Sequence, residues 1–141
     1  MRIALDCRSL GARATVSRLH DGGYFHIFKG ARVAGPLTAY IAANVLATLI
    51  LPSPSFTESG GAIIFADLEG TALRNGIAAW GRFADTSDLG VVDLSIGGVP
   101  PIGVNPLPGD PVFDMLFIDP TFSATGPVSL RGYTLTFPEG I

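Results

Sequence analysis

The sequence predicts an all-β protein with an antiparallel β-sandwich or jelly-roll-like fold, preceded by a short N-terminal arm or helix. From Tyr24 to Phe137, short apolar stretches are separated by Gly, Pro, Asp, Asn or Ser at a spacing typical of sandwiches and barrels. No segments suited to crossover helices separate these stretches, which disfavours a parallel sheet. We therefore expect an arm over residues 1–20 and a β-sandwich domain over residues 21–141.

The expected arm differs in composition from the rest of the chain. Four of the eight arginines fall there, namely Arg2, Arg8, Arg13 and Arg18, whereas glycine and proline are nearly absent. Ile3, Leu10 and Ala14 give a partial helical stripe that a glycine interrupts. The pattern predicts a short helix near Arg2–Leu10, followed by an irregular segment.

Two stretches in the first half of the chain are strand candidates. Tyr24–Lys29 is dominated by aromatic and β-branched residues, which favour strands. Val45–Leu51 alternates, so that one face would carry Val45, Ala47, Leu49 and Leu51. Gly30–Pro36 between them is typical of a loop, and Leu37–Ala43 fits either a loop or a helical turn. A Pro-Ser-Pro sequence then ends the second strand.

The second half carries the remaining strand candidates. In order, they are Ala62–Ala66, Ile77–Ala84, Gly90–Ile96, Phe113–Ile118 and Val128–Phe137. A turn at Asp85–Asp88 would join the second and third of these as a hairpin. Trp80 is expected as a core anchor or an interface residue, on one face with Ala78 and Arg82. The Gly- and Pro-rich residues Gly97–Pro111 predict a long excursion outside regular structure.

Composition favours a protein that buries apolar surface against other chains. Hydrophobic residues make up 48% of the 141 residues and charged residues 15%, and the mean hydropathy is +0.44. The weakly polar run Leu37–Leu51 is too short for a membrane span, which needs about 20 apolar residues. The net charge of −3, without a cluster of Lys and Arg, argues against nucleic acid as a partner. We expect a homo-oligomer, with a dimer favoured by symmetry.

No residue pattern indicates catalysis, a metal or a cofactor, so the sequence predicts a protein that is not an enzyme. His20 and His26, the two histidines, have no nucleophile or carboxylate in a catalytic pattern and are expected to be packed or on the surface. Asp85, Asp88 and Asp93 lack the ordered spacing of a calcium loop, and the first two are typical turn formers. The single cysteine excludes an internal disulfide and fits synthesis in a reducing cytoplasm.

Several short segments of the sequence follow one another in an order that resembles a known family. They are Phe25–Gly30, Leu46–Leu51 followed by Pro54-Ser55-Phe56, Ala79–Asp85, Gly90–Gly98 and Tyr133–Thr136. This order resembles small β-rich virion proteins of tailed bacteriophages, of the capsid cement or decoration type. The resemblance extends over Tyr24–Phe137, about four-fifths of the chain, and the chain departs from it in the arm and in Gly97–Pro111.

The resemblance implies a structural virion protein that cements or decorates a phage capsid by binding the major capsid protein. Its place would be the capsid exterior, after synthesis in the host cytoplasm, and no cofactor is implied. The alternative is a tail-associated or receptor-binding β-sandwich module that recognises a surface glycan. Because arginine forks bind carboxylates and proline-rich loops lose little entropy on docking, we expect the partner contacts in the two departing segments. The predicted interface residues are Arg2, Arg8, Arg13, Arg18, Pro100, Pro101, Pro106 and Pro108.

Overall fold

The computed structural model describes residues 2–3, 17–59, 62–100, 103, 105, 107–110, 112–131 and 133–136. Within these ranges the elements are thirteen strands and one 3-10 turn, η1, so the predicted all-β class is confirmed. In chain order they are β1 (Arg2–Ile3), β2 (Gly23–Phe28), η1 (Ala42–Asn44), β3 (Val45–Leu51), β4 (Phe56–Ser59), β5 (Ala62–Phe65), β6 (Leu68–Thr71), β7 (Gly76–Ile77), β8 (Trp80–Ala84), β9 (Gly90–Gly98), β10 (Met115–Phe117), β11 (Thr121–Phe122), β12 (Pro127–Leu130) and β13 (Thr134–Thr136).

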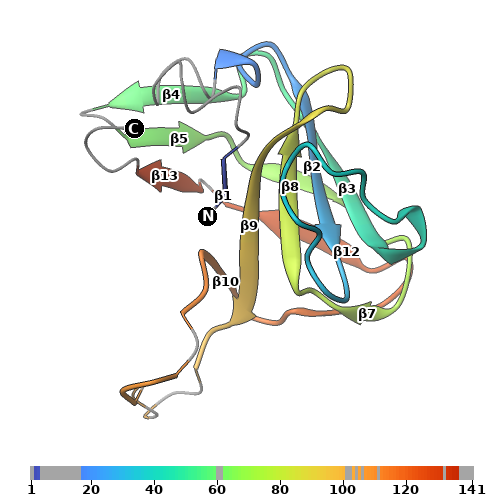
Figure 1. The fold of residues 1–141 in the computed structure, drawn as a ribbon, viewed down its shortest axis with the longest axis vertical. Helices are drawn as coiled ribbons and strands as arrows, with labels where there is room; N and C mark the ends of the chain where they lie inside the picture. Colours follow the sequence, from blue (N-terminus) through green and yellow to red (C-terminus); the bar gives the residue numbers. More distant parts are fainter. Residues whose placement is uncertain are drawn as a thin grey trace.

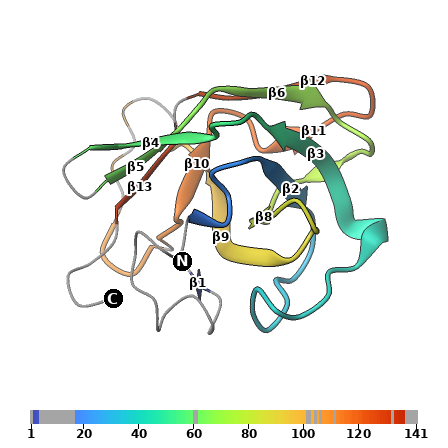
Figure 2. The same ribbon diagram turned by 90° about the horizontal axis from the view of Figure 1, so that it is seen from above.

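The strands form a curled sheet around one interior. The main sheet has the order β1-β9-β8-β2-β3, and β10 also pairs with β9. Next to β3 lies β6, which pairs with β12 and continues the curled wall. Viewed from above, β6 and β12 lie across the interior from β8 and β9 (Figure 2). A second sheet, β13-β5-β4, lies at the upper left of Figure 1, and β7 pairs with β11.

The strongest strand predictions are confirmed. Tyr24–Lys29 corresponds to β2, and Val45–Leu51 is β3. The predicted hairpin is present, because β8 and β9 pair antiparallel across the turn at Asp85–Asp88. Asp85 is a turn former as expected, since its Oδ1 accepts the backbone N–H groups of Ser87 and Leu89, both at 3.0 Å.

A β-bulge corrects the predicted faces of Val45 and Leu46 in β3. The pairing of β2 with β3 shifts register between Ile27 and Phe28, which pair with Ala47 and Val45. A bulge inserts one unpaired residue and so reverses the side on which the next side chain lies. Leu46 consequently packs in the main core, whereas Val45 packs on the other face of the sheet with Phe28.

One predicted strand is divided in two. Ile77–Ala84 becomes β7 and β8, because the chain leaves the ladder between them. The N–H of Ala78 donates to the carbonyl of Pro120, and the N–H of Ala79 donates to the carbonyl of Phe28. These two bonds replace the strand pairing that the continuous pattern predicted.

The end of the chain departs further from the predicted elements. Val128–Phe137 is divided into β12 and β13, which pair with β6 and β5. Phe113–Ile118 shortens to β10, and its pairing with β9 is parallel, so the antiparallel expectation is wrong for this pair. Because β9 continues to Gly98, the excursion predicted over Gly97–Pro111 begins at Val99. The sequence did not predict β4, β6 or β11.

The predicted helix near Arg2–Leu10 is also corrected where the structure describes it. Arg2 and Ile3 form β1, which pairs antiparallel with Asp93 and Val92 of β9. The other positions of that prediction lie outside the described residues. The division at residue 20 stays a prediction, although Leu19, on its N-terminal side, is fully buried in the core.

Phe83 of β8 lies at the centre of the main core and is fully buried. Its ring centroid is 4.5 Å from that of Phe25 and 4.3 Å from that of Phe65, with the Phe65 ring nearly parallel at 13°. Such aromatic pairs contribute about 0.5–1.5 kcal/mol each beyond the area they bury. They hold β8 and β2 of the main sheet against β5 of the second sheet.

Lys29–Asn44, here called the covering loop, joins β2 to β3 and passes over the outer face of the main sheet (Figure 1). Beneath it, Trp80 stacks on Phe28 with centroids 3.9 Å apart, and Val45 completes a second apolar cluster. The prediction that Trp80 shares a face with Ala78 is wrong, because Ala78 packs in the main core before β8 begins. Trp80 is a core residue, with 2% of its surface exposed.

A buried ion pair anchors the covering loop to the sheet. The Arg82 guanidinium donates to both carboxylate oxygens of Asp93, with Nε–Oδ1 at 2.7 Å and Nη2–Oδ2 at 3.1 Å. It also donates to the carbonyls of Thr38 and Gly35 in the covering loop, at 2.8 and 2.9 Å. The two charged side chains are 3% and 0% exposed. The Arg82 guanidinium therefore joins β8 to β9 and joins the main sheet to the covering loop.

Candidate functional site

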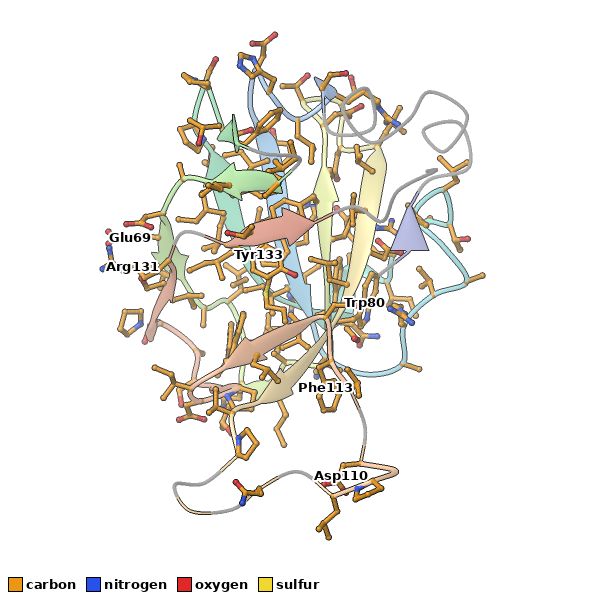
Figure 3. All side chains as sticks on the ribbon, turned by 90° about the vertical axis from the view of Figure 1, so that its left-hand side faces the viewer. Glu69, Trp80, Asp110, Phe113, Arg131 and Tyr133 are labelled. Carbon is orange, nitrogen blue, oxygen red and sulfur yellow. The ribbon has the colours of Figure 1, made fainter. Side chains whose placement is uncertain are left out.

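A groove of about 740 Å³ lies between β10 and β12. Its lining comes from these two strands, from residues 113–114 before β10, from residues 118–119, 121–123 and 126 between the strands, from Ala72, and from Arg131 and Tyr133 before β13. Most of its side chains are apolar, including Ala72, Met115, Leu116, Phe117, Phe122, Val128 and Leu130. The volume lies within the range of about 300–1,000 Å³ that is typical of binding sites. Figure 3 looks onto this side of the molecule, with Tyr133 beside β13 and Phe113 below it.

Polar contacts fix the position of β10 beside the groove. The Asp114 carboxylate accepts hydrogen bonds from the backbone N–H and the hydroxyl of Ser95 on β9, at 3.0 and 3.1 Å. The Ser95 hydroxyl oxygen in turn accepts the N–H of Asp114 at 2.9 Å. Across the groove, the Tyr133 hydroxyl donates to the carbonyl of Asp114 at 2.8 Å. Both flanks of the groove are thereby held at this end.

Large apolar side chains are exposed on β10 and on the segment that leads to it. Six of the thirteen exposed large hydrophobic residues among the described residues fall between positions 99 and 118: Val99, Leu107, Val112, Phe113, Leu116 and Ile118. Val112 and Ile118 are each 94% exposed. The described part of the segment before β10 projects below the sheets (Figure 1), and Asp110 lies on it near the lower end of Figure 3. Clustered exposed apolar side chains of this kind mark interaction surfaces.

The same part of the chain carries only negative charge. Residues 83–130 contain six aspartates and no Lys, Arg or His. Three of the six lie beside the groove or on the projecting segment, namely Asp110, Asp114 and Asp119. The one basic residue in the groove lining is Arg131, which pairs with Asp67 at 3.4 Å and Glu69 at 3.3 Å. Among the described residues, acidic side chains therefore outnumber basic ones around the groove.

The structure places the predicted interface prolines next to this surface where it describes them. Pro100 and Pro108 are exposed on the projecting segment. Pro101 and Pro106 lie outside the described residues, so their prediction rests on the sequence alone. The groove itself was not predicted, although the long run without basic residues was a visible signal of an unusual surface.

The predicted interface arginines are placed differently. Arg2 takes part in β1 through its backbone, and Arg8 and Arg13 lie outside the described residues. Arg18 donates to Asp85 in the turn between β8 and β9, at 2.9 Å. Burial raises the pKa of Asp85, but the Arg18 guanidinium and the N–H groups of Leu89 and Ser87 outweigh it and hold the pKa below its usual value. Arg18 thus binds this chain's own turn.

A second polar cluster lies on the outer face of the main sheet. His26 is within 2.8 Å of the Thr48 hydroxyl through Nδ1 and within 2.6 Å of Asp88 Oδ1 through Nε2. The other oxygen of Asp88 accepts the hydroxyl of Tyr40 at 2.7 Å. A hydroxyl, an imidazole and a carboxylate in line can relay a proton. The Asp88 carboxylate also binds Tyr40 of the covering loop, so these contacts hold that loop to the turn between β8 and β9.

We expect the titration of Tyr40 to report this contact. The hydrogen bond to Asp88, with help from burial, raises the pKa of Tyr40 to about 12. A raised tyrosine pKa stabilises the folded state fully below the unfolded value of about 10, and this stability is lost as the pH rises toward 12. Asp88→Asn should lower the pKa of Tyr40, measured by tyrosinate absorbance, and asparagine tolerates the positive φ of 60° at this position.

Tyr133 is the internal control for that titration. Burial, followed by the charge of Asp114, raises the pKa of Tyr133 to about 12, and Asp88 takes no part. The Asp88→Asn spectrum should therefore keep one high-pH tyrosine. An unchanged high-pH titration in the variant would contradict the contact between Tyr40 and Asp88.

Comparison with known protein families, with characterised proteins and with solved structures gave no match. The described part of the chain has no helix long and apolar enough to cross a membrane. Among the same residues, no group of three or more His, Cys, Asp or Glu side chains is placed to hold a metal ion. The groove, the projecting segment and their charge are therefore the features of the described residues that bear on function.

Proposed function

We propose that the chain is a structural protein of a phage virion that binds the major capsid protein on the capsid exterior, without catalytic activity of its own. The observation that carries the proposal is the apolar, acidic surface formed by the groove and the projecting segment. We call this the docking surface, and it comprises residues 99–100, 107–110, 112–119 and 127–131.

The character of the docking surface supports a protein partner. A typical monomer leaves no more than about 300–600 Å² of contiguous apolar patch exposed, and larger patches are mostly interfaces. A stable interface buries about 800 Å² on each partner, with an apolar centre and a polar rim. The docking surface has this organisation, because apolar side chains line the groove and aspartates lie around it.

The location of the family resemblance is consistent with this assignment. The segments that carry it, such as Ala79–Asp85 and Gly90–Gly98, lie largely in the main sheet. The projecting segment is one of the two places where the sequence departs from the resemblance. A protein that binds one particular capsid needs a main sheet like that of its family and a docking segment that is specific to its partner. The jelly-roll-like arrangement and a dimeric state belong to this proposal, and light scattering tests the dimer.

Quantitative mass spectrometry of separated heads and tails, from the phage that encodes the chain, tests the proposal. We expect the protein in heads, at a copy number comparable to that of the major capsid protein. A few copies confined to tails would overturn the capsid assignment in favour of the glycan-binding tail module. Absence from purified particles would overturn the virion assignment altogether.

A further inference from the structure

We propose that copies of this chain associate end to end, through two unlike ends of the curled sheet that carry opposite charge. The acidic end comprises Asp21 and residues 85–89, beside the turn between β8 and β9. The basic end comprises residues 29–32 of the covering loop and residues 73–77, which include β7. Neither end belongs to the docking surface, so the inference goes beyond the proposed function and does not rest on it.

Strand β2 connects the two ends along the main sheet. It begins two residues after Asp21 and ends directly before Lys29. Its neighbour β8 runs in the opposite direction and leads into the turn at residues 85–88. In Figure 1 that turn lies at the top of the molecule and β7 lies at the lower right. The six residues of β2 hold the two ends about 17 Å apart, so their opposite charges do not contact each other within one chain.

The basic end carries three cations, Lys29, Arg32 and Arg74. The backbone N–H of Lys29 donates to the carbonyl of Asn44 at 3.0 Å. The Arg74 guanidinium donates to the carbonyl of the next residue, Val45, at 2.7 Å, so both cations lie beside the start of β3. Arg32 follows in the covering loop, and its Nη1 has no hydrogen-bond partner among the described residues. None of the three cations takes part in an ion pair within those residues, so this end is positively charged.

The acidic end carries three aspartates and one arginine partner. Arg18 pairs with Asp85 at 2.9 Å. The other two, Asp21 and Asp88, each contact a histidine, at 3.0 and 2.6 Å, and neither pairs with Lys or Arg among the described residues. Asp21 is the more accessible of the two, with 88% of its side-chain surface exposed. With the histidines neutral, three carboxylates against one guanidinium leave this end negatively charged.

Each end also exposes large apolar side chains beside its charges. Leu73 and Ile77 are exposed at the basic end, and Leu89 is exposed at the acidic end. Stable contacts between proteins combine an apolar centre with groups of opposite charge at the rim. The two ends of this chain therefore complement each other in both respects.

Charge selects contact between unlike ends over contact between like ends. A two-fold contact through the basic end would bring the three cations of one copy against the same three of the other, and like charges oppose association. Contact between unlike ends instead brings the three cations of one copy near Asp21 and Asp88 of the next. Unlike surfaces in contact form rings or open chains, whereas a two-fold dimer joins like surfaces. The end-to-end contact is therefore separate from the dimer expected above.

Sedimentation velocity of the purified full chain tests the contact. We expect the mean mass to rise above 14.7 kDa with protein concentration in about 0.02 M salt, where charges are weakly screened. In about 0.5 M salt the screening length falls from roughly 20 Å to roughly 4 Å, and the association constant should fall at least about tenfold. Absence of concentration-dependent association in low salt, or association that salt does not weaken, would overturn the proposal.

Charge reversal at each end locates the contact. Asp21→Lys alters the acidic end and Arg74→Glu alters the basic end, and each variant alone should associate at least about fivefold more weakly. A mixture of the two should recover association, because the intact acidic end of the Arg74→Glu chain binds the intact basic end of the Asp21→Lys chain. Melting temperatures check that both variants fold, and Lys29→Glu replaces Arg74→Glu if loss of the Val45 contact destabilises it. A mixture that associates no better than the single variants would contradict end-to-end contact.

Glu69→Lys is the matched control. Glu69 is exposed on β6, outside both ends, and its reversal changes the net charge as much as Asp21→Lys does. This variant should associate end to end as the wild type does. Equal weakening by Glu69→Lys and Asp21→Lys would show that net charge governs association instead of the acidic end, and would overturn the proposal. Failure of the capsid assignment would leave these results unchanged, because no phage component is present in the experiment.

Discussion

Replacing Asp93 by alanine is expected to lower the free energy of unfolding by about 3–5 kcal/mol, the usual loss when one partner of a buried ion pair is removed. Asp93 is fully buried and is the only carboxylate that pairs with Arg82 within the described residues. The variant would leave the guanidinium buried without a counter-charge, because its other acceptors are two neutral carbonyls of the covering loop. Chemical denaturation followed by circular dichroism measures the loss.

Two variants make this result interpretable. Arg131→Ala removes exposed ion pairs with Asp67 and Glu69 and should cost less than about 1 kcal/mol. The double variant Arg82→Met with Asp93→Leu removes both buried charges, so it should recover much of the stability that Asp93→Ala loses. Equal effects of Asp93→Ala and Arg131→Ala would show that the buried pair does not hold the covering loop.

Trp80→Ala is expected to destabilise the fold by about 3–5 kcal/mol, the range for removing a large buried aromatic side chain. Trp80 is 2% exposed, stacks on Phe28 and lies 5.4 Å from the Arg82 guanidinium carbon. Its removal opens a cavity under the covering loop and exposes the ion pair beside it. As the single tryptophan of the chain, it also serves as the fluorescent probe for unfolding of the wild type.

The matched control for Trp80 is an aromatic residue of the docking surface. Phe113 is 39% exposed, so Phe113→Ala should change the melting temperature much less. An unchanged melting temperature in Trp80→Ala would place this residue among the contact residues instead of the core. A red-shifted emission of the folded wild type would contradict its burial in the same way.

The elements that the sequence predicted well are those whose pattern is local. Val45–Leu51 is an apolar run interrupted only by Thr48, and the turn at Asp85–Asp88 lies between two apolar runs. The strands that were missed are short and polar, such as Leu68–Thr71, whose Glu and Thr side chains are exposed. Such a strand exists because a distant segment, here β12, supplies its hydrogen bonds. The residues of Leu68–Thr71 alone therefore do not predict its pairing with β12.

The candidate site illustrates the same limit. The Pro-rich segment and the strand candidate at Phe113–Ile118 were visible in the sequence, and so was the absence of basic residues. The groove depends on the parallel pairing of β10 with β9 and on the position of β12, both of which are long-range. The role of Asp93 was not predicted either, although the hairpin that places it opposite Arg82 was. Its partner Arg82 lies eleven residues away, directly opposite on the neighbouring strand.

Hydrogen–deuterium exchange tests the proposal that the docking surface contacts the virion. The full chain would be compared free and bound to phage heads that lack it. We expect slowed exchange in Met115–Phe117 and Pro127–Leu130, and unchanged exchange in the buried strand Val45–Leu51. Protection confined to other segments, with no change in these two strands, would contradict the account.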